Sequence, residues 1–320
     1  MICLCCGKVI NNPSESEEKS RWHNKCVKNF FGTDEFPKLD VDNESLIAIA
    51  KKSVKKGYTI QGVQKKMSLH LATVPESRLT IVDYPNGYIL KPQTEDYKNL
   101  PEYEHLSMLM AEICGIRTVP HALMKISDQY VYITKRIDRN IKNDIVLKYA
   151  MEDFCQLAGR LTEDKYRGSY EQCCKILSSY SEQRNLDMSE LYMRIIFCFI
   201  IGNSDMHLKN FSLKEIEPLK RKYVLSEAYD LLPVNIVNPK DKDETALALN
   251  GKKRNLRRKD FLILAENFEI TQAAANSMIR SIIKKRDKMV ECCRNSFLNN
   301  EQIESFICFI DDRINRIYTE

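Results

Sequence analysis

IGNSDMHLKNFS, at positions 201–212, is the most informative segment of this chain. It follows an apolar run at 195–201 and places Asp205 five positions ahead of Asn210. A carboxylate and a carboxamide at this spacing are typical of a kinase catalytic loop, in which the Asp accepts the proton of the attacking hydroxyl and the Asn binds Mg²⁺. The spacing also occurs by chance, so the alternative is that Asp205 caps a turn and Asn210 closes it.

Further polar residues lie around and beyond this segment. Asp230 follows a short strand-like run at 223–225, and it is predicted to supply a second metal carboxylate because Mg²⁺ prefers oxygen ligands. His207 and Lys209 flank Asp205. We expect Lys209 to neutralise charge on the transferring phosphate. For His207 two interpretations stay open, a catalytic role and a structural histidine bonded to the backbone.

Upstream segments supply the other groups of a nucleotide site. Lys91 ends an apolar strand, as does the kinase lysine that reaches the α- and β-phosphates. Glu104 lies in the first turn of a helix predicted from the spacing of apolar residues, where it can pair with Lys91. An earlier loop carries Gly62, and its backbone N–H groups, with Lys65 or Lys66, are predicted to cradle phosphate.

Along the chain these groups come in the order loop, Lys, Glu, Asp with Asn, and a final Asp. This order resembles that of the HipA-like serine/threonine kinases of bacterial toxin–antitoxin systems. The resemblance implies an α+β, two-lobed protein-kinase-like fold, related also to phosphoinositide kinases, with a β-rich N-lobe and a helical C-lobe. It implies ATP and Mg²⁺ as cofactors. The motifs that carry it are TIQGVQKK at 59–66, ILKP at 89–92, ITKRIDR at 133–139, EDFCQ at 152–156, GNSDMHLKN at 202–210 and AYDLLP at 228–233.

The resemblance also implies roles for single residues. Lys135 to Ile137 would form the adenine-binding hinge, and Gln156 and Tyr229 would line the nucleotide site. The family commonly has Glu and Phe where this chain has Lys135 and Ile137, and we expect altered packing on adenine with binding retained, because hinge contacts are mainly backbone. A hydroxyl residue in the position of Thr59 can be autophosphorylated in such kinases, and the added charge of about −1.5 to −2 would keep the loop from closing over ATP.

Relatives in this family phosphorylate aminoacyl-tRNA synthetases and so arrest translation, and a synthetase is the expected class of protein substrate. A separate antitoxin, of one or two proteins, is also expected. Because the chain shows no helix-turn-helix pattern, DNA would be contacted only through the antitoxin. Two alternatives are a small-molecule kinase, which shares the Asp205–Asn210 spacing, and a non-catalytic kinase-like binding module. The presence of Lys91, Asp205, Asn210 and Asp230 together argues against the second.

The N-terminus carries a separate pattern. Cys3 and Cys6 form a C-x-x-C pair, and His23 and Cys26 form an H-x-x-C pair. Three thiolates and one imidazole suit a tetrahedral Zn²⁺, and so small a module could not bury enough apolar surface unaided. The prediction is a structural zinc knuckle, in which Cys5 could replace Cys3. The alternative is a set of reduced cysteines packed as small hydrophobes.

The composition fits one two-lobed enzyme. We expect a zinc-knuckle-like extension at 1–40, a kinase N-lobe at 41–140 and a helical C-lobe at 141–320. The 12 cysteines are scattered and no leader precedes them, so reduced thiols and a cytoplasmic location are expected. No apolar run approaches the length of a membrane span. The net charge is +5, and the basic cluster at 252–259 is either a solvated approach to a helix or a surface for an acidic partner such as tRNA or DNA.

Hydrophobic periodicity predicts the order of the elements. An Asn-Gly hairpin is expected at 84–87, and Thr271 is expected to cap a helix. Strands are predicted at 66–73, 79–83, 88–91, 123–126 and 130–136. Helices are predicted at 43–56, 151–159, 170–180, 188–201, 258–268, 271–287 and 301–318, with the Glu104 helix crossing the N-lobe.

Overall fold

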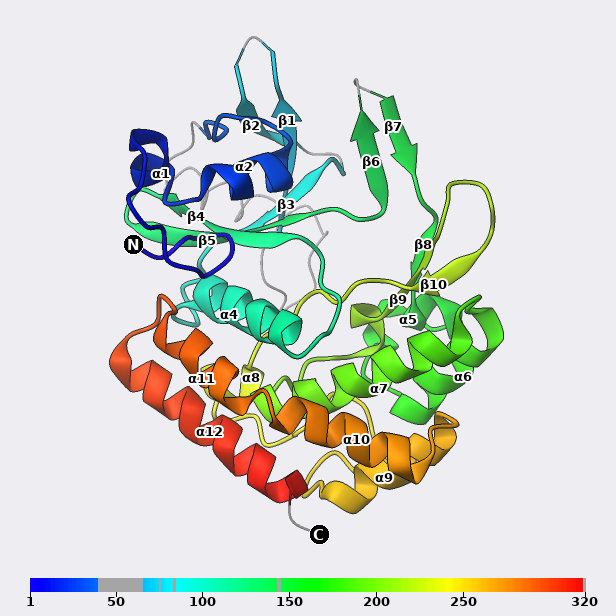
Figure 1. Cartoon of the computed structure of the whole chain (residues 1–320). Helices are drawn as coiled ribbons and strands as arrows, with labels where there is room; N and C mark the ends of the chain where they lie inside the picture. The colour runs from blue at the N-terminus through cyan, green and yellow to red at the C-terminus, as the bar shows by residue number, and fades with distance from the viewer. Residues whose placement is uncertain (40–65, 75, 83–84, 143–144, 319–320) are drawn as a thin grey trace.

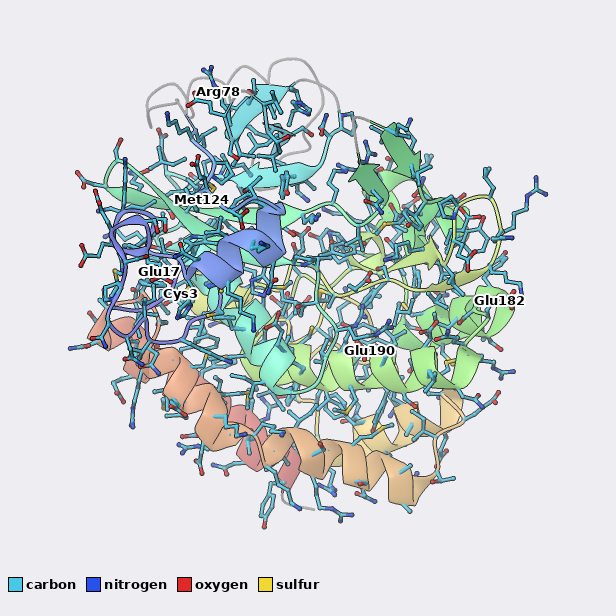
Figure 2. All side chains as sticks on the ribbon, turned by 45° about the horizontal axis from the view of Figure 1, so that its top comes forward. Cys3, Glu17, Arg78, Met124, Glu182 and Glu190 are labelled. Carbon is cyan, nitrogen blue, oxygen red and sulfur yellow. The ribbon has the colours of Figure 1, made fainter. Side chains whose placement is uncertain are left out.

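A sheet-rich lobe lies against a larger helical lobe in the computed structural model, as Figure 1 shows. The structure describes residues 1–39, 66–74, 76–82, 85–142 and 145–318. Thr59, Gly62 and the helix expected at 43–56 lie outside the described residues. Side chains fill the space between the elements, and Figure 2 places Cys3 at one end of the molecule and Glu182 at the other. The two-lobed α+β architecture is the one that the motif order predicted.

The N-lobe is built on a five-stranded antiparallel sheet with the strand order β2-β1-β3-β5-β4. Alternate residues of β1, such as Met67 and Leu69, are buried, as expected of a strand with one face on a core. The strands are β1 (Met67–Ala72), β2 (Arg78–Val82), β3 (Tyr88–Lys91), β4 (His121–Ile126) and β5 (Gln129–Lys135).

The strand order corrects the hairpin expected at 84–87. Strands β2 and β3 each pair with β1, on opposite sides, and not with each other. An Asn-Gly pair is a local signal for a tight reversal. The pairing of strands is decided instead by which apolar faces meet across the whole sheet, and that is information the turn residues do not contain.

Helix α4 (Leu100–Ile113) crosses beneath the sheet and carries Glu104. It packs on β4 and β5 on one side and on α11 (Arg286–Arg294) on the other. Pro101 occupies its first turn, where the missing N–H costs no helical hydrogen bond. A helix covered on both sides is apolar around most of its surface. Glu104 is therefore only 1% exposed, and so a charged group is held inside the lobe.

The first 39 residues share the hydrophobic core of the N-lobe. Helices α1 (Glu15–Ser20) and α2 (Asn24–Phe31) lie beside the sheet, as Figure 1 shows in dark blue. The ring of Trp22 stacks on Phe31 with 5.4 Å between centroids, and Phe31 in turn lies 5.5 Å from Tyr88 of β3. These aromatic contacts attach the N-terminal segment to the sheet.

The C-lobe is a helical assembly around α7 (Arg184–Ile201). Helix α7 ends at Gly202, whose φ of 76° is left-handed and where a Cβ would come within 2.7 Å of Phe309. Only glycine fits this turn into the 201–212 segment. Thr271 caps α10 as predicted, since its Oγ1 accepts the Ala274 N–H at 3.2 Å. The remaining helices are α5 (Phe154–Leu157), α6 (Tyr170–Tyr180), α8 (Val234–Val237), α9 (Arg258–Asn267), α10 (Gln272–Ile283) and α12 (Asn300–Tyr318).

Two predicted helices are wrong in extent. The one expected at 151–159 begins as strand β8 (Met151–Asp153), because the Asp153 carboxylate accepts the Gln156 N–H at 2.9 Å and starts α5 there. The one expected at 271–287 is divided between α10 and α11. Strand β8 pairs with β9 (Ser212–Glu215), which pairs with β10 (Tyr223–Leu225). The hairpin of β6 (Arg139–Lys142) and β7 (Ile145–Lys148) was not predicted.

No helix in the part of the chain that the structure describes is both long enough and apolar enough to cross a bilayer.

Candidate active site

Lys91 lies between two carboxylates where the lobes meet. Its Nζ is 2.5 Å from Glu104 Oε1 and also contacts Asp230 Oδ1. The three residues come from the end of β3, from α4 and from the segment after β10, and the Lys91 side chain is only 4% exposed. A buried ammonium group requires such partners. The structure thus brings together three of the residues selected from the sequence.

The charges in this cluster stabilise one another. Burial alone would lower the pKa of Lys91, but Asp230 and Glu104 raise it well above its ordinary value. Burial raises the pKa of Glu104 to about 7, although Lys91 opposes the shift. Burial would also raise the pKa of Asp230, but Lys66 and Lys91 hold it far below its usual range. Asp230 is therefore ionised, with Lys66 Nζ 3.1 Å from its Oδ2.

The backbone of Asp230 adopts a left-handed conformation, with a φ of 56°. Asp and Asn adopt this region more readily than other residues with a Cβ, so the turn at Asp230 is compatible with its side chain.

Asp205 and Asn210 belong to one hydrogen-bonded loop. The Asn210 Nδ2 donates to the Asp205 carbonyl oxygen at 2.9 Å, and the His207 N–H donates to the same oxygen at 2.8 Å. Because its Nδ2 is used inside the loop, Asn210 offers its amide oxygen as the group that can bind a cation. Burial raises the pKa of Asp205, and a hydrogen bond from Tyr166 opposes that rise.

Tyr166 is the residue that sequence reasoning missed. Its hydroxyl donates to Asp205 Oδ1 at 2.5 Å, and its ring packs edge-on against His207 with 5.0 Å between centroids. It lies between the 3₁₀ turn Thr162–Asp164 and α6, in a segment without helical or strand periodicity. No local pattern could have connected it to Asp205, since the two are 39 positions apart.

His207 and Lys209 are engaged within the protein. The His207 Nδ1 accepts the Lys209 N–H at 3.2 Å, so the ring caps the 3₁₀ turn Leu208–Asn210. Burial lowers the pKa of His207 to about 4, and the imidazole is neutral at pH 7. Lys209 Nζ pairs with Asp153 Oδ2 at 2.6 Å. The geometry thus favours the structural interpretation of His207. The charge of Lys209 is neutralised by the Asp153 carboxylate.

Tyr229 and Gln156 support segments beside the Asp205–Asn210 loop. The Tyr229 hydroxyl lies 2.6 Å from Ser212 Oγ and donates to the Lys209 carbonyl at 3.1 Å. The Gln156 Oε1 accepts the Asp153 N–H at 3.1 Å and so completes the N-terminal cap of α5. Both side chains are therefore used to hold segments in place next to the Lys209–Asp153 pair.

The expected hinge follows β5. Lys135 is its last residue, with an exposed side chain, and its N–H donates to the Pro120 carbonyl at 2.9 Å. Ile137 is partly buried and packs against the core. Their contact with adenine stays a prediction.

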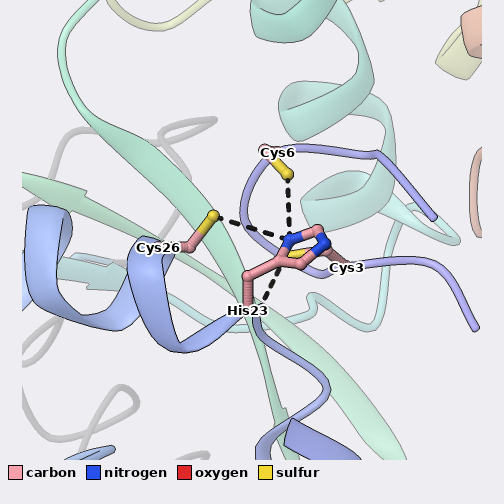
Figure 3. Close-up of side chains that lie close together, drawn as sticks. All are labelled: Cys3, Cys6, His23 and Cys26. Carbon is pink, nitrogen blue, oxygen red and sulfur yellow. Dashed lines mark hydrogen bonds between the residues drawn. The ribbon is translucent and has the colours of Figure 1, made fainter. Parts of the chain in front are cut away.

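A second cluster lies at the N-terminus, where the turn at positions 3–7 meets the start of α2. The four expected zinc ligands, Cys3, Cys6, His23 and Cys26, have their ligand atoms within 4.8 Å of one another. Figure 3 shows the three thiols and the imidazole pointing toward a common centre. The structure therefore brings this predicted set together, and Cys5 is not part of it.

The fold and the Lys91, Asp205, Asn210 and Asp230 constellation define a protein-kinase-like architecture. The chain belongs to the HipA-like C-terminal domain family, whose model matches residues 58–290. A Haemophilus influenzae protein named "Putative kinase" is 24% identical over 294 residues, which cover 84% of each chain. "Putative kinase Y4dM" of Sinorhizobium fredii is 29% identical over 262 residues, covering 76% of this chain and 61% of that protein.

Two solved structures share the fold. HipA of Shewanella oneidensis MR-1, in a complex of the toxin–antitoxin system with HipB and operator DNA, matches with a TM-score of 0.67 and 16% identity, over 84% of this chain and 70% of its own. The Helicobacter pylori proinflammatory kinase CtkA matches with a TM-score of 0.54 and 14% identity, over 75% of this chain and 90% of its own. The sequence-based assignment to a HipA-like kinase is thus confirmed at the level of family and fold.

Proposed function

We propose that the chain is an ATP- and Mg²⁺-dependent serine/threonine protein kinase. The observation that carries the proposal is the buried contact of Lys91 with both Glu104 and Asp230, next to the Asp205–Asn210 loop. A cation that is fixed by one carboxylate and shared with another is suited to bind phosphate. The donor set also fits a metal-bound nucleotide, because Asp230 and Asn210 offer the hard oxygen ligands that Mg²⁺ prefers.

In this proposal the protein positions groups and supplies charge, and forms no covalent intermediate. Bound Mg²⁺ would neutralise the β- and γ-phosphates. Lys91, oriented by Glu104, would bind the α- and β-phosphates, and Asp205 would accept the proton of a Ser or Thr hydroxyl. The raised pKa of Asp205 makes it a better proton acceptor than a fully solvated carboxylate.

Lys66 is placed to exchange partners when ligands bind. Its side chain is 43% exposed and pairs with the Asp230 oxygen that Lys91 does not contact. A metal on Asp230 would displace the Lys66 ammonium, and the free lysine could then bind phosphate. This role agrees with the sequence-based expectation that Lys65 or Lys66 contributes to phosphate binding.

The proposed substrate is a protein of the translation apparatus, such as an aminoacyl-tRNA synthetase, and the proposed partner is a separate antitoxin. Support comes from the family and from the Shewanella HipA structure, which contains HipB and operator DNA. DNA would be reached through the antitoxin. Phosphoproteomics of cells that express the chain, with Asp205→Ala as the inactive reference, would identify the substrate.

The kinase proposal is tested by transfer of labelled γ-phosphate to proteins of a cell extract, followed by mass spectrometry of the modified residues. We expect Mg²⁺-dependent phosphoserine or phosphothreonine with the wild-type chain and none with Asp205→Ala. Asp128→Ala is the matched control, because Asp128 is fully exposed in the turn after β4 and far from Asp205 in the fold. Full transfer by Asp205→Ala would refute the proposal.

Autophosphorylation at Thr59 belongs to the same proposal and is supported by the family resemblance. Intact-mass and peptide mass spectrometry after incubation with Mg-ATP would detect it. We expect slow phosphate incorporation at Thr59 with falling activity, and unchanged activity at full incorporation would remove this form of regulation.

A further inference from the structure

We propose that Cys3, Cys6, His23 and Cys26 bind one structural Zn²⁺ that clamps the N-terminal segment onto the free edge of the N-lobe sheet. The proposal does not depend on phosphotransfer. It has two parts, a metal site and a mechanical role for that site, and each is supported by separate contacts.

The spacing of the ligand atoms matches a zinc tetrahedron. Zn–S bonds of about 2.3 Å and Zn–N bonds of about 2.0–2.1 Å imply S···N edges of roughly 3.6 Å. The His23 Nδ1 lies 3.5 Å from Cys6 Sγ and 3.8 Å from Cys26 Sγ. All four ligand atoms lie within 4.8 Å of one another, so zinc can bind with small side-chain adjustments.

The tautomer of His23 is fixed by a neighbouring carbonyl. The His23 Nε2 lies 3.2 Å from the Val9 carbonyl oxygen. A carbonyl only accepts hydrogen bonds, so Nε2 carries the proton and the Nδ1 lone pair faces the thiols. A metal-binding histidine is usually oriented in this way, by a hydrogen bond from its other nitrogen.

The ligands lie on two segments, which the Leu4 N–H also joins by donating to the Arg21 carbonyl at 2.9 Å. Cys3 and Cys6 lie in a tight turn, where the Gly7 N–H donates to the Cys3 carbonyl at 3.0 Å. His23 precedes α2, and Cys26 lies in its first turn. A thiolate-rich set at such spacing selects zinc over hard cations such as Mg²⁺. The ion would join the turn to the helix.

Both segments hold the same residue of the sheet. The Leu123 N–H donates to the Leu4 carbonyl at 2.8 Å, and the Leu123 carbonyl accepts the Trp22 Nε1–H at 3.0 Å. Leu4 lies between the two cysteines of the turn, and Trp22 directly precedes His23. Leu123 belongs to β4, the last strand of the sheet. The clamp therefore satisfies part of a strand edge that would otherwise be open to other chains.

The turn also rests on α4. A Cβ at Gly7, whose φ is 67°, would come within 2.8 Å of Leu109 of that helix. The metal-bearing turn thus contacts the helix that carries Glu104. Loss of zinc should release both β4 and α4 from this contact.

Metal content tests whether the four residues bind zinc. Wild-type protein that is purified without chelator is expected to contain about one zinc per chain, and cobalt loading should give the visible absorption of a tetrahedral thiolate site. Cys6→Ser and Cys26→Ser should lose the metal. Cys5→Ser is the matched control, since Cys5 lies in the same turn outside the converging set.

Several results would overturn the site. They are absence of zinc and of a cobalt spectrum in wild-type protein, a disulfide between these cysteines in the purified protein, or equal metal loss in Cys5→Ser and Cys6→Ser. If the serine variants do not fold, chelation and cobalt titration of the wild-type chain still decide the question.

Tryptophan fluorescence tests the mechanical role of the zinc site. Trp22 is the chain's single tryptophan and is fully buried against the clamp. Removal of zinc by a chelator should shift its emission to longer wavelength, and added Zn²⁺, but not Mg²⁺, should reverse the shift. Stoichiometric removal of zinc with unchanged emission would show that the ion does not hold the segment on β4.

Discussion

The Lys91 cluster and the Cys3 cluster are both converging sets of side chains, but they converge for different reasons. In the Lys91 cluster, Lys91 and Lys66 neutralise Asp230 and Glu104. The Cys3 cluster brings together three sulfur donors and one nitrogen donor. Opposite charges attract one another, whereas lone pairs converge only where an ion or a proton can be shared between them.

The two sites need different things in order to function. In the proposed kinase the Lys91 cluster would exchange partners, because a metal would bind Asp230 as Lys66 leaves it. The N-terminal cluster must not exchange anything if its role is to hold a turn and a helix together. One site should therefore respond to Mg²⁺ and nucleotide, and the other to zinc alone.

Removal of a carboxylate from the Lys91 cluster should have the largest effect. Asp230→Ala is expected to lower phosphotransfer by roughly 10³-fold or more, because it removes a metal ligand from the transition state. Since Asp205→Ala impairs the same step, the double variant should be little slower than either single one. Additive losses in initial rate would show that the two residues act independently.

Zinc removal should lower the stability of the chain independently of the Lys91 cluster. We expect chelation to lower the Tm by roughly 5–10 °C, because loss of a structural metal removes a few kcal/mol. The decrease should be the same in Asp230→Ala. Calorimetry would measure both, and a smaller decrease in Asp230→Ala would mean that zinc and the Lys91 cluster are coupled.

His207 provides a pH test within the Asp205–Asn210 loop. Its pKa falls from an ordinary value of 6.5 to about 4 in the folded chain. The folded state thus binds fewer protons at His207 than the unfolded state does. The contribution of neutral His207 to the free energy of unfolding is therefore fully present above pH 6.5 and is lost as the pH falls through 4. His207→Asn keeps an acceptor for the Lys209 N–H but does not titrate.

Denaturant unfolding of both proteins between pH 7 and 4 would measure the effect. The wild type should lose about 3 kcal/mol relative to His207→Asn. Activity of the variant near pH 7.5 should stay within a few-fold of the wild type. A loss of several orders of magnitude would instead establish a catalytic role for His207.

Tyr166→Phe should give the smallest change. Without the Tyr166 hydrogen bond the pKa of Asp205 should rise further, since that bond opposes the effect of burial. In a plot of kcat/KM against pH, the acidic limb is expected to move to higher pH by up to about one unit. Tyr180→Phe is the control, as Tyr180 is exposed at the end of α6. A limb that does not move would exclude Tyr166 from tuning Asp205.

Elements with a strong local pattern were predictable, and those that depend on distant partners were not. Strand β3 and helix α6 have the predicted bounds, because β3 is a short apolar run that ends at Lys91 and the apolar residues of α6 recur at helical spacing. The segment at 151–159 changes from strand to helix at Asp153. It does so because β8 pairs with β9, which lies much later in the chain.

The candidate site divides in the same way. Lys91 and Glu104 were correctly paired from the sequence, since a strand end and a helix start of the right type preceded the Asp205 segment. Lys209 was expected on phosphate, but the structure pairs it with Asp153, which is 56 positions away. A local motif shows which charged groups are present, but it does not show which of them will pair in the folded chain.

The amino-acid sequence specifies the inventory of chemical groups and their order, because residue type and local spacing set the kinase motifs and the two Cys and His pairs. Which of these groups meet depends on the folded chain. It placed Tyr166 on Asp205, used His207 as a cap, and brought the two N-terminal pairs together over Leu123. These choices follow from packing and burial, which sum over the whole chain and are not written in any short segment.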